Sequence, residues 1–197
     1  WWALEGRGPL LAQVCLVLAL ALLLSGGLHM DGAMDTADGL AAGERRLEAM
    51  ADSRVGAAGA QALALLLLLR AGGLALLAGA APAAVPWLLP WAALWGRTAP
   101  LVAMDRFPYL RPQGSAAFHR RHWAGLAIEL RPALLTAALL LPLTGWRAGA
   151  GAAALAFSGL VPALAVPIRL GRRLGGHSGD SYGACVEWSE SLALLLS

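Results

Sequence analysis

The sequence contains no lysine, and only 14% of its 197 residues are charged. Soluble domains of ordinary composition carry about 25% charged residues. Hydrophobic residues make up 58% of the chain. A water-soluble fold of this length could not bury so much apolar surface, whereas a bilayer can. The composition therefore indicates an integral membrane protein, and the length favours a single membrane-embedded domain over 1–197.

Other absences exclude whole classes of function. The only cysteines, Cys15 and Cys185, lie in apolar stretches without pairing or metal-ligand spacing, which is typical of small buried residues. GxSxG, P-loop, paired CxxC and HExxH motifs are all missing, as is a nucleophilic serine or cysteine beside a base. The arginines alternate with apolar segments of spanning length, so membrane orientation explains them better than a nucleic-acid partner.

Long apolar stretches dominate what remains. A membrane-spanning helix needs about 20 mostly apolar residues. Stretches close to this length cover 9–25, 55–79, 83–104, 125–146 and 148–170, and a shorter one covers 182–197. They are rich in alanine and leucine and show no period-2 alternation, so they predict helices. The expected fold class is all-α, a polytopic integral membrane helical bundle of about six transmembrane or membrane-embedded helices.

The arginine distribution predicts how this bundle is oriented. Ten of the fifteen arginines fall in the connections 26–54, 105–124 and 169–181, and the two short connections contribute only Arg147. If each stretch crosses once, the three arginine-rich connections share one side, which the positive-inside rule makes cytoplasmic. All six aspartates lie in or beside these connections. We therefore expect a multi-pass protein of the cytoplasmic (inner) membrane whose active site faces the cytoplasm.

Three aspartates in the first connection form the strongest motif. Asp31, Asp35 and Asp38 are spaced by four and three residues, which places them on one face of a helix. Continuing by sevens reaches Arg45 and Asp52 on the same stripe. Carboxylates this close repel one another, and a divalent cation such as Mg²⁺ offsets the repulsion while bridging phosphates. The alternatives are a solvated acidic face or charges that complement a helix dipole.

Three further residues flank this motif. His29 can act as a ligand or a substrate contact, although a hydrogen-bonded interfacial histidine explains it equally well. Asp52 can complete the metal site. Arg54 can hold a phosphate, or it can anchor the start of a span through the positive-inside rule.

A glycine-rich segment follows the fifth apolar stretch. Its backbone can approach an anion closely, and the N–H groups at the next helix start favour phosphate. Glu187 lies seven residues after Asp180, so both can face inward, and acidic residues in a membrane helix are functional by default. Alternatively, the last stretch lies at the interface with solvated carboxylates. The candidate residues of the segment are Arg172, Arg173, Gly175, Gly176, Ser178 and Asp180.

Together these motifs resemble one family. The runs GGLHMDGAMDTADG at 26–39, DSRVG at 52–56 and GGHSGD at 175–180, with Gly183, Ala184 and Glu187, closely resemble cobalamin synthase, also called adenosylcobinamide-GDP ribazoletransferase. The resemblance runs from about residue 9 to the C-terminus, and the middle matches more loosely. The family's pattern also predicts that the chain is N-terminally incomplete, because a further stretch with a first span normally precedes it. The turn reads His177-Ser178 where the family usually has threonine before Gly-Asp.

The resemblance implies a Mg²⁺-dependent phosphotransferase. It would join adenosylcobinamide-GDP to α-ribazole, or to α-ribazole 5′-phosphate, releasing GMP and closing the nucleotide loop of the cobamide. Membrane lipid surrounds such an enzyme, and a second copy of the chain or other corrinoid-assembly enzymes are candidate partners. Two other readings remain open at this point. They are a CDP-alcohol phosphotransferase, from whose motif the aspartate spacing departs, and a cation transporter, which would place acids near mid-membrane on several helices.

Residue roles follow from this resemblance and from the chemistry above. The expected catalytic residues are Asp35, Asp38 and Asp180, with Asp38 as the proton acceptor. The expected metal ligands are Asp31, Asp35, Asp38, Asp52, Asp180 and Glu187. The expected substrate-binding residues are His29, Arg54, Arg172, Arg173, Gly175, Gly176 and Ser178.

Overall fold

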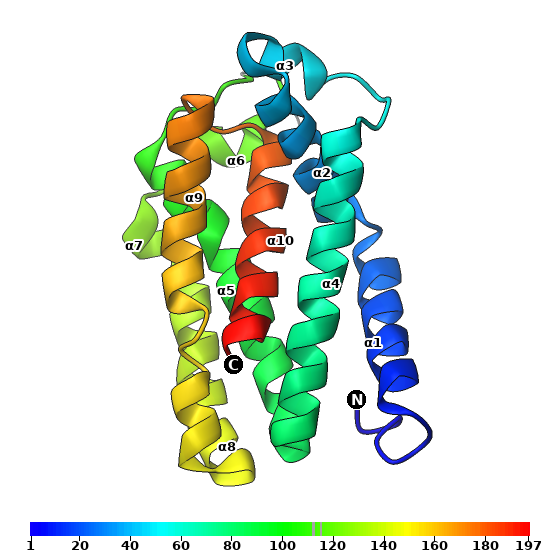
Figure 1. Ribbon diagram of the computed structural model, residues 1–197. Coiled ribbons are helices and arrows are strands. Elements are labelled where there is room, and N and C mark those ends of the chain that lie inside the picture. The colour runs from blue at the N-terminus through cyan, green and yellow to red at the C-terminus, as the bar shows by residue number, and fades with distance from the viewer. Residues whose placement is uncertain (112, 115) are drawn as a thin grey trace.

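The computed structural model describes residues 1–111, 113–114 and 116–197, and this part of the chain is helical without any strand (Figure 1). An all-α fold is thereby confirmed. The elements in chain order are α1 (Leu10–Ser25), α2 (Leu28–Ala41), η1 (Gly43–Arg45), α3 (Arg46–Ala49), α4 (Ala57–Ala80), η2 (Pro82–Ala84), α5 (Val85–Arg106), α6 (Ala117–Arg121), α7 (Leu126–Glu129), α8 (Arg131–Leu155), α9 (Leu160–Leu174) and α10 (Gly179–Leu196).

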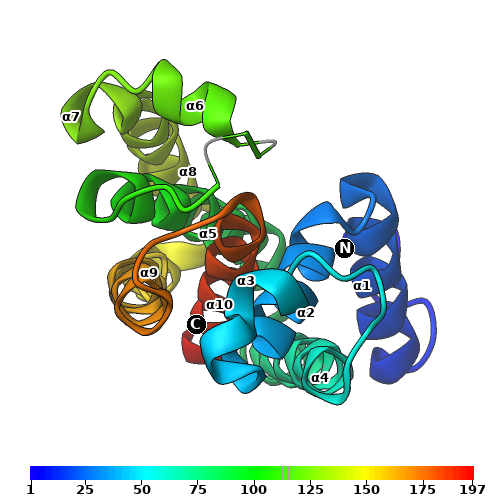
Figure 2. The same cartoon turned by 90° about the horizontal axis from the view of Figure 1, so that it is seen from above.

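Helix α10 is the central element of the bundle. It packs against α2, α4, α5 and α9, and the view from above shows these helices around it (Figure 2). Most of its side chains are buried, from Ser181 near its start to Leu194 near its end. The alternative that this last stretch lies at the membrane interface with solvated carboxylates is therefore wrong, since Glu187 is only 5% exposed.

Fewer helices have the length and composition of a span than the sequence suggested. Within the described residues, α4 and the continuous run Leu126–Leu155 are long and apolar enough to cross a membrane. Helices α1 and α2 qualify only as a pair, and they are bent by 90° at Gly26 and Gly27, whose φ angles are both positive. The predicted count of about six is not confirmed, because α9 has only 15 residues, α10 carries three carboxylates, and α5 is also not among the helices with the composition of a span.

The predicted stretch 148–170 is divided in the structure. The backbone of Gly149 is non-helical, with φ +85°, and it ends the straight part of α8. A turn at 156–159 then separates the end of α8 from the start of α9. The indole of Trp95 from α5 packs against this turn. Its Nε1 donates to the Ala156 carbonyl at 2.7 Å, and its ring lies against Gly159. Sequence hydropathy does not register such a break because the residues around it remain apolar.

The three arginine-rich connections meet at one end of the bundle, as predicted (the upper end in Figure 1). Hydrogen bonds join them directly. Arg111 donates to the Leu47 carbonyl at 3.0 Å, Arg46 donates to the Arg173 carbonyl at 2.6 Å, and the Leu110 amide donates to His177 at 2.7 Å. The three sequence motifs therefore come together at this end of the bundle.

Candidate active site

The aspartate motif is helical, as its spacing predicted. Asp31, Asp35 and Asp38 lie on α2, which begins after the left-handed Gly27 and ends at Ala41. The extension of the stripe by sevens to Arg45 and Asp52 is wrong, because the chain turns at Gly43, whose φ is +63°. Residues beyond this turn do not share a face with the aspartates of α2.

A close crossing of α2 and α10 brings Asp180 to the motif. A Cβ added to Gly32 would lie 2.6 Å from the Asp180 carbonyl oxygen, and one added to Gly183 would lie 3.0 Å from the His29 carbonyl oxygen. Only glycine permits this approach, because a Cβ atom 2.6 Å from a backbone oxygen would force the two helices apart. The crossing sets the first turn of α10 against the acidic helix.

The carboxylates gathered at this crossing perturb one another. The pKa of Asp35 is raised to about 6, first because the group is partly buried and then because the negative charges of Asp31, Asp180 and Asp38 lie nearby. Arg111 opposes the shift and forms an ion pair with Asp180 at 2.9 Å. Helix α2 is only about 21 Å long and carries three aspartates, so we place it outside the spans.

Asp38 is engaged in a different way from its neighbours. Its two carboxylate oxygens accept hydrogen bonds from the Gly56 and Gly59 amides, both at 2.8 Å. These amides belong to the start of α4, so Asp38 caps that helix from a distance in sequence. Side chains at 56 or 59 would collide with the carboxylate. Each oxygen keeps a further lone pair, so the cap does not prevent contact with substrate.

Asp52 and Arg54 lie apart from this cluster. They form an ion pair with each other at 2.6 Å in an exposed loop, and the Arg54 hydrogen bonds lower the pKa of Asp52 to about 2. Their neighbours Arg45 and Glu48 line a pocket of about 310 Å³ with them. In the described part of the chain, no three His, Cys, Asp or Glu side chains lie close enough together to hold a metal ion as they are placed.

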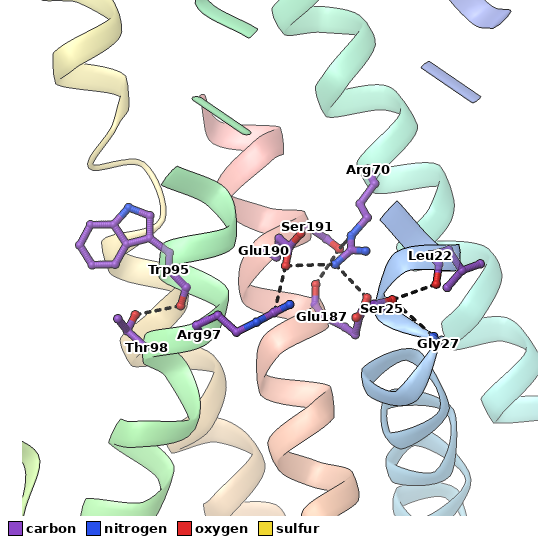
Figure 3. Close-up of polar contacts among 10 residues, drawn as sticks. All are labelled: Leu22, Ser25, Gly27, Arg70, Trp95, Arg97, Thr98, Glu187, Glu190 and Ser191. Carbon is purple, nitrogen blue, oxygen red and sulfur yellow. Dashed lines mark hydrogen bonds and ion pairs between the residues drawn. The ribbon is translucent and has the colours of Figure 1, made fainter. Parts of the chain in front are cut away.

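Glu187 faces inward as predicted, but it has a different partner from the aspartates. It pairs with Arg70 of α4 at 2.8 Å, and Glu190 lies between Arg70 and Arg97 of α5 at 3.7 and 3.5 Å (Figure 3). The hydroxyl of Ser191 also accepts from Arg70 at 3.0 Å. Glu187 is about 10 Å along α10 from Asp180, two turns deeper in the bundle. The network ties α4, α5 and α10 together.

The glycine-rich turn supports Asp180 instead of lying open to an anion. Gly175, with φ +79°, ends α9, and Gly176 lies against the Pro108 carbonyl oxygen. The Ser178 hydroxyl accepts from the Ser181 amide at 3.3 Å as the cap of α10, and it donates to Asp180 at 3.3 Å. Ser178 is fully buried.

His177 completes the support of the turn. Its Nε2–H donates to the Pro167 carbonyl at 3.1 Å, so its Nδ1 accepts from the Ser181 hydroxyl at 3.0 Å. Burial lowers the pKa of this histidine to about 4.

Three predicted substrate-binding residues do not face the aspartates. Arg172 and Arg173 lie exposed in the last turn of α9. Arg173 contacts a groove lined by Ala37 and Leu40 of α2, and these residues lie about 180° around that helix from the acidic face. His29 lies on α2 beneath Gly183, and its Nδ1 is buried without a hydrogen-bond partner among the described residues.

The sequence interpretation assigned no site role to Arg70 or Arg97. Arg111 lies in an arginine-rich connection that could draw a polyanionic substrate toward the site, but orientation alone also explains an arginine there, so its sequence position did not identify it as the partner of Asp180. Arg70 and Arg97 lie inside apolar stretches, and a charge in such a stretch marks a candidate polar network. That signal was available in the sequence.

Comparison with known proteins agrees with these motifs. The family model for cobalamin-5-phosphate synthase matches residues 1–197. The chain belongs to this family. It is 52% identical to an adenosylcobinamide-GDP ribazoletransferase of Prochlorococcus marinus (strain MIT 9303), over 95% of this chain and 74% of that protein.

More distant members of the cobalamin-5-phosphate synthase family match over similar lengths. Identity is 44% to the ribazoletransferase of Thermosynechococcus vestitus, covering 91% of this chain and 70% of that protein. It is 40% to the one from Trichormus variabilis, covering 94% and 74%. No solved structure matches the chain.

Proposed function

We propose that this chain transfers the phospho-cobinamide part of adenosylcobinamide-GDP to α-ribazole or α-ribazole 5′-phosphate and releases GMP. The names of its relatives and the family match support this reaction. It completes the nucleotide loop of a cobamide. The reaction forms one phosphoester bond to the ribazole hydroxyl and breaks the pyrophosphate bond to GMP.

The observation that carries the proposal is the group of carboxylates around Asp35. Four aspartates from α2 and α10 share one locality, and the repulsion among them contributes to the raised pKa of Asp35. Such a cluster is unfavourable unless a cation offsets it. The substrate of the proposed reaction is a pyrophosphate, which also requires charge neutralisation.

The donor chemistry of the cluster fits Mg²⁺, whose preferred ligands are hard oxygens. Asp31, Asp35 and Asp180 would hold it, and their side chains would need to rotate closer together than they lie here. When bound, Mg²⁺ would neutralise negative charge on the pyrophosphate oxygens. Asp52 and Glu187 are engaged in ion pairs elsewhere, so we propose no metal-ligand role for them.

The chain's own residues divide the remaining tasks. Asp38 lies one turn from Asp35, and the amides of Gly56 and Gly59 fix the orientation of its carboxylate. We assign it the proton that the ribazole hydroxyl loses as it attacks phosphorus. Arg111 holds Asp180 in place through one terminal nitrogen while the other donates to the Leu47 carbonyl, and we assign its remaining N–H groups to a substrate phosphate. An open cleft of about 490 Å³ lies beside Arg111 and is lined also by Ala51, Gln113 and Gly114.

We further propose that the site faces the cytoplasm at the inner membrane. The positive-inside rule favours the cytoplasmic side for the end at which the arginine-rich connections meet, and nucleotide-activated substrates are found in the cytoplasm. The apolar spans α4 and Leu126–Leu155 hold the protein in the membrane.

The test is GMP release from adenosylcobinamide-GDP by the purified protein, with α-ribazole and saturating Mg²⁺. We expect Asp35→Asn and Asp38→Asn each to lower kcat at least about a hundredfold. Asp105→Asn is the matched control, because Asp105 lies near the same end and, among the described residues, forms an ion pair only with its neighbour Arg106. Folded Asp35→Asn and Asp38→Asn proteins that release GMP at the wild-type rate would contradict the proposal.

A further inference from the structure

A second feature of the same end of the bundle has no part in the proposed reaction. It is an apolar groove of about 310 Å³ between α2, α9 and α10. In the view from above, α9 and α2 lie on either side of α10 (Figure 2). Arg169 and Arg173 stand at the groove, and its apolar lining includes Ala37, Leu40, Val166, Leu170, Trp188 and Leu192.

The groove is polar at one end and apolar at the other. Arg173 lies in the last turn of α9, at the end of the bundle where the arginine-rich connections meet, and Arg169 lies one turn deeper. Val166 lies about 10 Å below Arg173 along the helix, and Leu192 lines the groove from the far half of α10. A ligand that matches this gradient has an anionic head and an apolar tail.

The arginines at the groove lack acidic partners. Arg169 and Arg173 form no ion pair with a carboxylate anywhere in the described part of the chain, and neither does Arg172 beside them. An adjoining pocket is lined by one acidic residue, Glu44, together with Arg46 and Arg173. A single carboxylate does not neutralise these arginines, so the groove mouth keeps a net positive charge.

We propose that this groove is a binding site for an anionic phospholipid. The phosphate lies between Arg169 and Arg173, and an acyl chain lies along Leu170 and Trp188 toward Val166. Interfacial basic pockets between membrane helices have this character. The ligand is a lipid and not the pyrophosphate substrate, because the groove lies on the face of α2 opposite the aspartates. Lipid is also present wherever the spans of this chain are embedded.

A lipid in this position would stabilise the packing of α2, which carries the three aspartates, against α9. Ala37 and Leu40 belong to α2, while Arg169 and Arg173 belong to α9, so the ligand joins the two helices along one side of α10. The inference does not depend on the identity of the reaction, and its test uses no activity measurement.

The experiment measures lipid retained by the full chain in dodecyl maltoside, by native mass spectrometry during titration with phosphatidylglycerol or phosphatidylcholine. We expect tighter binding of phosphatidylglycerol. Each arginine contributes roughly fivefold in affinity, so Arg169→Gln/Arg173→Gln should bind it about 25-fold more weakly. Arg172→Gln removes one positive charge from the same helix outside the groove, and it should change affinity less than threefold.

A second variant keeps the test decisive if the double arginine variant does not fold. Ala37→Trp fills the groove and leaves every charge in place, and we expect it to abolish the preferential binding. Equal retention of the two lipids by the wild-type protein would overturn the proposal. So would unchanged phosphatidylglycerol binding by Ala37→Trp, or binding of glycerol 3-phosphate as tight as that of phosphatidylglycerol.

Discussion

Neighbouring aspartates of one motif have different environments. Both carboxylate oxygens of Asp38 accept hydrogen bonds from amides at the start of α4, and these bonds couple the orientation of the side chain to the position of that helix. Asp35, one turn away, faces other carboxylates and holds its proton up to a pH of about 6. The same residue type therefore holds the start of α4 in one case and joins a group of mutually repelling carboxylates in the other, and the difference arises from the partners of each side chain.

His177 shows the cost of a buried titratable group at this site. Its pKa of about 4 in the folded protein lies below the ordinary histidine value of 6.5, so the neutral ring is favoured by folding. Its contribution to stability is complete above pH 6.5 and is lost as pH falls toward 4. The difference corresponds to about 3 kcal/mol.

The prediction for His177 concerns the pH dependence of unfolding. Between pH 7.5 and pH 4.5, the thermal midpoint of the wild-type protein in detergent should fall further than that of His177→Gln, whose side chain does not titrate. His119→Gln, which removes an exposed histidine, should behave like the wild type. Parallel declines in the wild type and His177→Gln would contradict the assignment.

At the scale of elements, sequence periodicity correctly predicted a helix, but it did not predict which side chains pair in the folded protein. The spacing of Asp31, Asp35 and Asp38 correctly predicted a helix because local backbone geometry alone determines which residues share its face. The placement of Asp52 failed because Gly43 reverses the chain before that residue. Glu187 was predicted to face inward and does, but its pairing with Arg70 depends on the packing of α4 against α10, which no local pattern encodes.

The crossing of α2 and α10 is the element contact on which the site depends. In Gly32→Ala the new Cβ would meet the Asp180 carbonyl oxygen at 2.6 Å, so the two helices must separate. We expect a loss of about 1–3 kcal/mol in stability. A displacement of reacting groups by even 1 Å costs about a hundredfold in rate, so kcat for GMP release should fall at least tenfold.

Gly72→Ala is the matched control for this prediction. Gly72 lies within α4, and nothing stands within 4 Å of an added Cβ. The change should leave kcat unaffected and stabilise the protein by up to about 1 kcal/mol, because alanine is the better helix former. A Gly32→Ala protein as active and as stable as Gly72→Ala would show that the crossing tolerates separation.

At the scale of the whole molecule, charge distribution was a better guide than hydropathy. Counting arginines correctly grouped three distant connections at one end. Counting apolar stretches predicted about six membrane helices, and this count is not confirmed, because the α1–α2 pair bends by 90° and the central α10 carries carboxylates that other helices cover. A central helix surrounded by protein does not need a lipid-compatible sequence, so its hydropathy says little about its position.

This grouping predicts which positions are accessible from each side of the membrane. In a background of Cys15→Ser and Cys185→Ala, single cysteines replace Glu48 and Arg121, which are exposed at the arginine-rich end, or Ala83, which is exposed in η2 beside the opposite end of α4. A membrane-impermeant maleimide should label positions 48 and 121 only in inside-out vesicles, and position 83 only in right-side-out vesicles. Detergent-solubilised protein, in which all three should react, controls for intrinsic reactivity. Labelling of positions 48 and 121 from opposite sides would be incompatible with a bundle whose arginine-rich connections share one face.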